Sequence, residues 1–265
     1  MSTHAARTVE FLPTDRLIMV VGNCGSGKTE VAVNMAIAMA KEGRSVSIAD
    51  LDIVNPYFRC RDAHDLMAGH GIRVVIPPGA QAVADLPIIV PEIKGMLRPP
   101  EGQVSIFDVG GDPVGAKLLS SFHAHLGDAP YELWQVINSR RPFTRDLPGC
   151  LAMRAQIEES SRLKVTGLIA NAHLVQETTP AVIIEGYALA QAMSKTTGIP
   201  VKFVTAMGAL ADAPEVRAIG APVLQLTRHM LPPWIRPGAG SDRTQKTLPA
   251  GRPVPLGRRT RGSHQ

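Results

Sequence analysis

One eight-residue segment near the N-terminus carries the residue types that bind a phosphate chain. Residues 22–29, with the sequence GNCGSGKT, match the pattern G-x-x-x-x-G-K-[ST] in full. The small residues allow successive backbone N–H groups to point at one anion, and Lys28 can reach its β- and γ-phosphates. The hydroxyl of Thr29 can ligate Mg²⁺. The segment predicts a nucleotide-binding loop made of Gly22, Asn23, Cys24, Gly25, Ser26, Gly27, Lys28, Thr29 and Glu30.

Acidic side chains stand at the ends of two later apolar segments. Asp50 and Asp52 end the second such segment, and Asp108 ends a later one, followed by glycines at positions 110 and 111. In a parallel sheet the carboxyl ends of the strands line the ligand crevice. We therefore expect Asp50 and Asp108, together with Thr29, to hold Mg²⁺. A glycine N–H after Asp108 can contact the γ-phosphate and report its hydrolysis.

The segments that must position these residues alternate between strand and helix patterns. Short apolar runs predict strands over 17–21, 45–49, 72–76, 104–107, 133–137, 165–170, 201–204 and 222–226. Amphipathic segments predict helices over 30–42, 60–68, 116–125, 146–161 and 180–196. Residues 77–91 are rich in proline and stay unassigned. This alternation predicts an α/β fold with a mainly parallel sheet of seven or eight strands and helices on both faces.

The composition excludes several classes of protein. The 265 residues are 45% hydrophobic and 19% charged, as in a globular domain rather than a collagen, a coiled coil or a disordered chain. No apolar run reaches the roughly 18 residues of a membrane span, and residues 1–13 lack a signal-peptide pattern. The three cysteines form no C-x-x-C pair, which argues against a zinc or iron–sulfur site and favours a reduced, cytoplasmic setting.

The positive charge of the chain lies in its last 30 residues. Residues 236–265 carry seven basic side chains and one acidic one, whereas the preceding residues carry 21 basic and 22 acidic ones. We predict a flexible N-terminus over 1–13, a nucleotide-binding domain over 14–235 and a basic disordered tail over 236–265. Contact with nucleic acid is then expected only through the tail.

These motifs together resemble a known family. The phosphate loop, the D-x-D at Asp50 and Asp52 and the D-x-x-G at Asp108 resemble the MinD/ParA/CobQ-type ATPases over about residues 16–226. That family belongs to the wider SIMIBI class, with the signal-recognition GTPases and the nitrogenase iron protein. The resemblance implies that Asp52 positions the attacking water and that Asn171 reads the base. Leu174 stands where a guanine-reading N-K-x-D motif has its acid, which favours ATP.

The phosphate loop departs from the family at its second position. Family members usually carry a lysine there, which reaches across a homodimer, whereas this chain has Asn23. The departure argues against a homodimer closed by that lysine. A substitute cation would have to come from elsewhere, and the candidates are Arg59, Arg61, Arg140 and Arg141.

Three functions are compatible with these residues. The first is a Mg-ATP-binding and hydrolysing switch that acts on a protein partner and supports a metabolic enzyme or its cofactor, with Lys28, Asp52 and Asp108 as catalytic residues. The second is a small-molecule kinase or an ATP-dependent ligase, which shares the phosphate loop. The third is a DNA-associated partitioning ATPase that uses the basic tail. The sequence favours the first, because Arg140 and Arg141 are the only dense basic pair before the tail and give weak support for the arginine-rich lid of a kinase. It predicts no attachment to a membrane.

Overall fold

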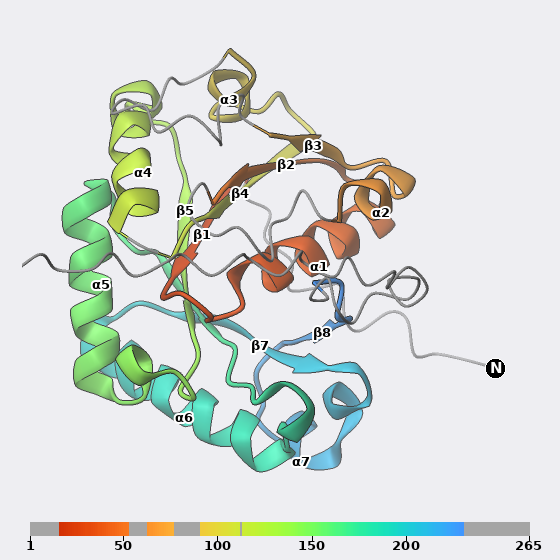
Figure 1. Ribbon diagram of the computed structural model, residues 1–265, viewed down its shortest axis with the longest axis vertical. Coiled ribbons are helices and arrows are strands. Elements are labelled where there is room, and N and C mark those ends of the chain that lie inside the picture. The colour runs from red at the N-terminus through yellow and green to blue at the C-terminus, as the bar shows by residue number, and fades with distance from the viewer. Residues whose placement is uncertain (1–15, 53–62, 77–90, 112, 231–265) are drawn as a thin grey trace, which may run out of the picture. The chain divides into compact units, whose positions relative to one another are not determined.

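The protein was analysed as a computed structural model that describes residues 16–52, 63–76, 91–111 and 113–230 (Figure 1). All described residues belong to one structural unit, residues 1–231. The predicted N-terminal segment and basic tail lie outside the described residues. So do Arg59 and Arg61, two of the candidate cations.

Eight parallel strands form a single sheet in the order β3-β2-β4-β1-β5-β6-β7-β8. The strands are β1 (Leu17–Gly22), β2 (Ser45–Leu51), β3 (Arg73–Val75), β4 (Gln103–Val109), β5 (Glu132–Ile137), β6 (Gly167–Ala170), β7 (Val201–Met207) and β8 (Val223–Leu226). The predicted fold class is confirmed, with the strand number at the upper end of the expected range.

In the described residues, seven α-helices connect these strands. They are α1 (Lys28–Lys41), α2 (His64–Gly69), α3 (Pro91–Met96), α4 (Pro113–Leu126), α5 (Leu147–Ser161), α6 (Pro180–Thr197) and α7 (Pro214–Arg217). None of the helices in the described part of the chain combines the length and apolar character needed to cross a bilayer.

The helices cover both faces of the sheet, as predicted. Leu17, Met19 and Val21 of β1 face a core built with α3 to α7, whereas Ile18 and Val20 face a core built with α1 and α2. All five side chains are at most 2% exposed. In Figure 1, α4 and α5 lie on one side of the central strands and α1 on the other. A strand covered on both faces is apolar throughout, which is why β1 reads as a continuous hydrophobic run.

Some helices begin at residues other than the predicted ones, because a glycine or a capping side chain determines where the helix starts. Helix α1 begins at Lys28, two residues early, because Gly27 has φ of 89° and its carbonyl already accepts from Val31 N. Helix α3 falls mainly beyond the unassigned segment and was not predicted. Helix α5 begins after Asp146, whose carboxylate accepts from Gly149 N at 2.9 Å and so caps the first turn.

Candidate nucleotide-binding site

The phosphate loop joins the central strand β1 to the N-terminus of α1. Its glycines at 22, 25 and 27 all have positive φ, between 72° and 144°, a region that side chains disfavour. Ser26 N donates to Asn23 O at 3.1 Å, and Lys28 Nζ donates to the same carbonyl at 3.1 Å. The ammonium group is therefore held against the loop, at the positive end of the helix dipole.

Two residues from distant segments pack against the outside of this loop. A Cβ on Gly27 would lie 2.3 Å from Asn171 Nδ2, and one on Gly25 would lie 3.1 Å from Arg141 Nε. Asn171 Nδ2 donates to Ser26 O at 2.6 Å, and Arg141 Nε donates to Gly25 O at 2.8 Å. Gly27 is thus required by a neighbouring side chain as well as by its own backbone conformation, whereas a Cβ on Gly25 would be in tight contact with the flexible Arg141 side chain.

The predicted acidic residues meet at one edge of the sheet. Asp50 of β2 and Asp108 of β4 are direct partners in the parallel register, and both have no solvent-exposed surface. Asp52 N donates to Asp50 Oδ1 at 3.1 Å. Burial, with a contribution from the charge of Asp50, raises the pKa of Asp108 to about 8, although Lys28 and Thr29 oppose the rise. The register confirms the expected convergence of Asp50 and Asp108.

The chemistry of this edge fits a magnesium ion. Among the described residues, neither carboxylate oxygen of Asp108 accepts a hydrogen bond of standard geometry, although the Thr29 hydroxyl lies close enough to lower the pKa. No group of three or more His, Cys, Asp and Glu in the described segments could hold a metal by itself. Mg²⁺ is usually bound by one or two carboxylates together with substrate phosphates, so Thr29, Asp50 and Asp108 suit a metal that arrives with a nucleotide.

The loop after Asp108 lies directly against the phosphate loop. A Cβ on Gly111 would lie 2.6 Å from Lys28 Nζ and 2.7 Å from Cys24 N, and one on Gly110 would lie 3.2 Å from Asp52 Oδ1. These distances leave no room for a side chain at position 111. The D-x-x-G segment is therefore in contact with the residues predicted to bind the phosphates and to position water.

Replacing Gly111 with alanine should slow nucleotide hydrolysis by about tenfold or more, because the new methyl group must displace either Lys28 or this loop. Release of phosphate under saturating nucleotide measures the effect. Gly95→Ala is the matched control, since a Cβ on that α3 glycine would meet no atom within 4 Å. Equal hydrolysis by Gly111→Ala and Gly95→Ala would contradict the assigned contact.

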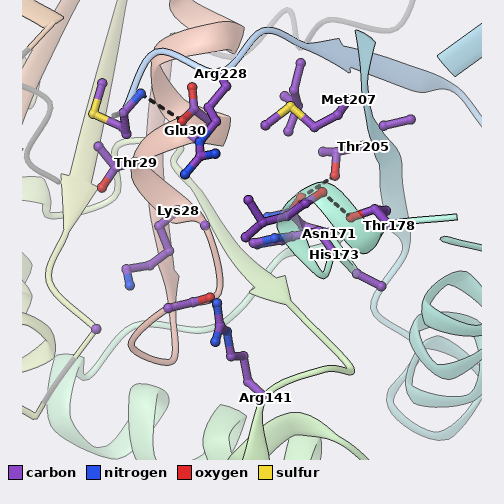
Figure 2. Close-up of a pocket in the computed structure, with 18 of the residues that line it drawn as sticks. Lys28, Thr29, Glu30, Arg141, Asn171, His173, Thr178, Thr205, Met207 and Arg228 are labelled. Atoms are coloured by element: carbon purple, nitrogen blue, oxygen red, sulfur yellow. Dashed lines mark hydrogen bonds between the residues drawn. The ribbon is translucent and has the colours of Figure 1, made fainter. Parts of the chain in front are cut away.

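A pocket of about 470 Å³ extends from the phosphate loop to the ends of β6, β7 and β8. Figure 2 shows Lys28 and Arg141 toward one end and Thr205 and Met207 toward the other. The phosphate end is lined by the loop residues, Asp52, Gly111 and Arg141. The far end is mainly apolar and is lined by Ala172, Val175, Ile183, Ala206, Met207, Leu226 and Met230. A cleft with a polar end and an apolar end suits a phosphorylated molecule with a flat organic group.

The comparisons with known proteins support the fold of this site. No protein-family model and no curated protein matches the sequence. The cell division protein FtsY from Thermotoga maritima aligns with a TM-score of 0.52 and 22% identity, over 79% of this chain and 72% of its own. Chloroplast FtsY from Physcomitrella patens aligns with a TM-score of 0.50 and 18% identity, over 76% of this chain and 65% of its own.

The chain has an FtsY-like P-loop fold. At identities below 25%, the similarity concerns the fold and carries no ligand or partner across. The predicted α/β P-loop fold is thus supported, while the resemblance to MinD/ParA/CobQ proteins and to the wider SIMIBI class stays a prediction.

In this FtsY-like fold, Asn171 lies at the junction of the phosphate loop and the apolar end of the pocket. Its amide nitrogen donates to Ser26 O, and its Oδ1 accepts from Thr205 Oγ1 at 2.5 Å. Both ends of the amide are therefore engaged within the protein. Its role in recognising the base stays a prediction. The contacts show in addition that Asn171 links the phosphate loop to β7.

His173 lines the same pocket between two arginines. Burial and, to a smaller extent, the positive charges of Arg141 and Arg228 together lower the pKa of its imidazole to about 4. The ring is therefore neutral at pH 7. A neutral imidazole near two guanidinium groups avoids electrostatic repulsion with them.

The nucleotide-free protein should lose stability as the pH falls from about 6.5 to about 4, because the His173 imidazole takes up a proton in the unfolded state but not in the folded one. His173→Gln should lose less stability over this range. Thermal unfolding at pH 7 and pH 4.5 gives the comparison. Buried carboxyl groups titrate in both proteins, so the difference between the two isolates His173, and identical pH profiles would show that its pKa is ordinary.

The two arginines predicted as substitute cations have different positions. Arg140 forms an ion pair with Glu185 of α6, whereas Arg141 bonds to the phosphate loop. Only the second lines the pocket. Sequence reasoning could name the pair but could not choose between its members.

Other pocket residues were missed or assigned differently by sequence reasoning. Glu30 was predicted to bind the nucleotide, and it does line the pocket, but its carboxylate accepts from His229 N at 2.7 Å and Met230 N at 3.0 Å. Arg228, Thr205 and Met207 were not predicted. Thr205 and Met207 belong to β7 and Arg228 follows β8. None of the three belongs to a sequence motif, so only the order of the strands in the sheet brings them to the pocket.

Proposed function

We propose that this protein is a Mg²⁺-dependent nucleoside triphosphatase that binds and hydrolyses ATP and acts as a switch on a protein partner. One observation carries the proposal: Lys28, Asp52 and Gly111 come from three separate segments and line one pocket. Asp50 and Asp108 lie at the same sheet edge. Phosphoryl transfer needs groups that bind the phosphates and the metal ion. This site offers a phosphate loop, a pair of carboxylates at the sheet edge and a glycine beside the expected position of the γ-phosphate.

The proposed chemistry assigns one task to each residue. The loop N–H groups and Lys28 hold the β- and γ-phosphates, and Thr29 with Asp108 and Asp50 holds the Mg²⁺ that neutralises them. Asp52, 6% exposed and beside Gly110, orients the attacking water. Arg141 supplies the positive charge that the Asn23 position lacks, as an arginine finger in cis.

Adenine is the base we propose. Guanine presents N–H donors that a carboxylate usually accepts in N-K-x-D proteins, and Leu174 stands at that place here. Glu30 and Asp52 are the acids that line the pocket among the described residues. Glu30 already accepts two backbone N–H groups, and Asp52 lies at the phosphate end. The apolar far end favours a base held by stacking and by backbone atoms.

The switch role follows from the loop at Gly111, which contacts the phosphate site and leads into α4. A γ-phosphate at this place would order the loop, and its release would free it. We propose that a protein partner in the cytoplasm binds differently to the ordered and the released loop. This partner would be a metabolic enzyme or an enzyme that handles its cofactor. A pulldown with and without a non-hydrolysable ATP analogue tests for such a partner.

Calorimetry with Mg²⁺ and non-hydrolysable analogues of ATP and GTP tests the nucleotide assignment. We expect the ATP analogue to bind at least tenfold more tightly, which is about 1.4 kcal/mol. Asp52→Asn should keep this affinity but hydrolyse ATP more slowly. Tighter binding of the GTP analogue would refute the choice of base, and transfer of phosphate to a metabolite rather than to water would replace the switch by a kinase.

A further inference from the structure

A short segment after β8 is held against α1 by hydrogen bonds. Thr227 N donates to Asn34 Oδ1 at 2.8 Å, and Asn34 Nδ2 donates back to Thr227 O at 2.9 Å. One turn earlier on the helix, Glu30 Oε1 and Oε2 accept from His229 N and Met230 N. Four hydrogen bonds from two side chains thus hold residues 227–230, which we call the C-terminal strap.

Arg228 lies between the two fastened points of the strap. Figure 2 shows its guanidinium directed into the pocket, between Glu30 and Asn171. Burial raises the pKa of Glu30, and the positive charge of Arg228 opposes this rise; burial lowers the pKa of His173, and the same charge adds to that fall. Within the described segments Arg228 itself makes no hydrogen bond or ion pair, because the Glu30 oxygens are occupied by the strap's backbone. The strap therefore presents an available, partly buried cation to the ligand.

The side chains around Arg228 indicate which part of a ligand it meets. Leu226 and Met230, its neighbours along the strand and the strap, and Met207 of β7 line the same end of the pocket. Lys28 and Arg141 already serve the phosphate end. The guanidinium lies near Glu30 and His173 in a pocket that these apolar side chains also line. A planar guanidinium can bind the face of an aromatic ring, since stacking and cation–π attraction need no counter-ion.

We propose that Arg228 stacks on the base of the bound nucleotide and that Asn34 and Glu30 are positioning residues that hold it there through the C-terminal strap. This inference rests on the proposed nucleotide site and adds a residue that binds the nucleoside rather than the phosphates. It also makes the base contact depend on α1, the helix whose first residue is Lys28.

Two ligands separate the nucleoside from the phosphates: a non-hydrolysable ATP analogue and inorganic tripolyphosphate, each titrated with Mg²⁺ by calorimetry. Arg228→Ala should weaken the ATP analogue by about tenfold, within the range of a desolvated cation–π contact, and leave tripolyphosphate unchanged within about twofold. Arg217→Ala is the matched control, because this exposed arginine pairs with Asp212 near α7 and does not line the pocket. It should leave both affinities unchanged.

Asn34→Ala tests the strap. It should reproduce the selective loss of the ATP analogue, and combining it with Arg228→Ala should add little, because both changes remove one contact. Thermal unfolding of each variant shows that the protein is folded. Additive losses in the double variant would overturn the positioning role.

The outcomes separate this inference from the proposed function. If the wild type binds neither ligand, the nucleotide site itself is wrong. If the wild type binds both ligands and Arg228→Ala does not alter them, or weakens both equally, the base contact is wrong while the nucleotide site stands.

Discussion

Replacing Lys28 with alanine should lower the affinity for Mg-ATP by at least about 100-fold and remove measurable hydrolysis. The lysine is 6% exposed, and its Nζ bonds to Asn23 O inside the phosphate loop. Truncating one partner of a buried charge pair costs about 2–5 kcal/mol, and 100-fold is about 2.8 kcal/mol. Calorimetry with a non-hydrolysable analogue measures the affinity, and a phosphate-release assay measures turnover.

Lys41→Ala is the control for this prediction. Lys41 is an exposed lysine in the last turn of the same helix, so its removal changes the net charge equally and leaves the phosphate loop untouched. It should bind and hydrolyse ATP like the wild type. Because Lys28 is buried, its variant should be shown to be folded by thermal unfolding. Unaltered binding by folded Lys28→Ala would remove the basis of the proposed function.

Replacing Arg141 with alanine should lower kcat by about 10²- to 10³-fold while changing the affinity for ATP much less. The guanidinium already lies at the rim of the phosphate loop, where Nε donates to Gly25 O at 2.8 Å. In the proposed mechanism, a cation at this place would stabilise charge that develops on the γ-phosphoryl oxygens, and arginine fingers contribute about 10³- to 10⁵-fold in other phosphoryl-transfer proteins. Single-turnover hydrolysis separates this effect from product release.

The neighbouring residue provides an unusually close control for Arg141. Arg140→Ala removes the same charge one position earlier in the chain, but that side chain pairs with Glu185 and does not line the pocket. Its kcat should stay within about twofold of the wild type. Equal losses in both variants would show that general electrostatics, and not a directed contact, is responsible. Arg141→Lys should recover little, because an ammonium lacks the planar fork.

Much of the fold was predictable because its signals are local. The buried strand β1 is a continuous apolar segment, β4 and β5 are mainly apolar, and the phosphate loop is a contiguous motif between a strand and a helix. Parallel topology then requires the acids at the ends of β2 and β4 to share an edge, which the register between Asp50 and Asp108 confirms. These conclusions need only the period of the hydrophobic pattern and the direction of the strands.

The remainder depended on contacts between residues far apart in the chain. Arg141 bonds to a loop residue 116 positions earlier, Asn171 to one 145 positions earlier, and Asn34 to Thr227, 193 positions later. No local sequence pattern predicts such pairs, because each depends on the order of the strands in the sheet and on the position of each residue along its strand, helix or loop.

The sequence by itself thus determined the fold class and the phosphate-binding loop, since both follow from local residue spacing. Only the tertiary structure decided between Arg140 and Arg141, revealed the second role of Asn171 and brought Arg228 over the pocket. The physical reason is that hydrogen bonds and ion pairs form only between groups that lie close together in space. The order of the strands in the sheet determines which residues, far apart in the sequence, come that close.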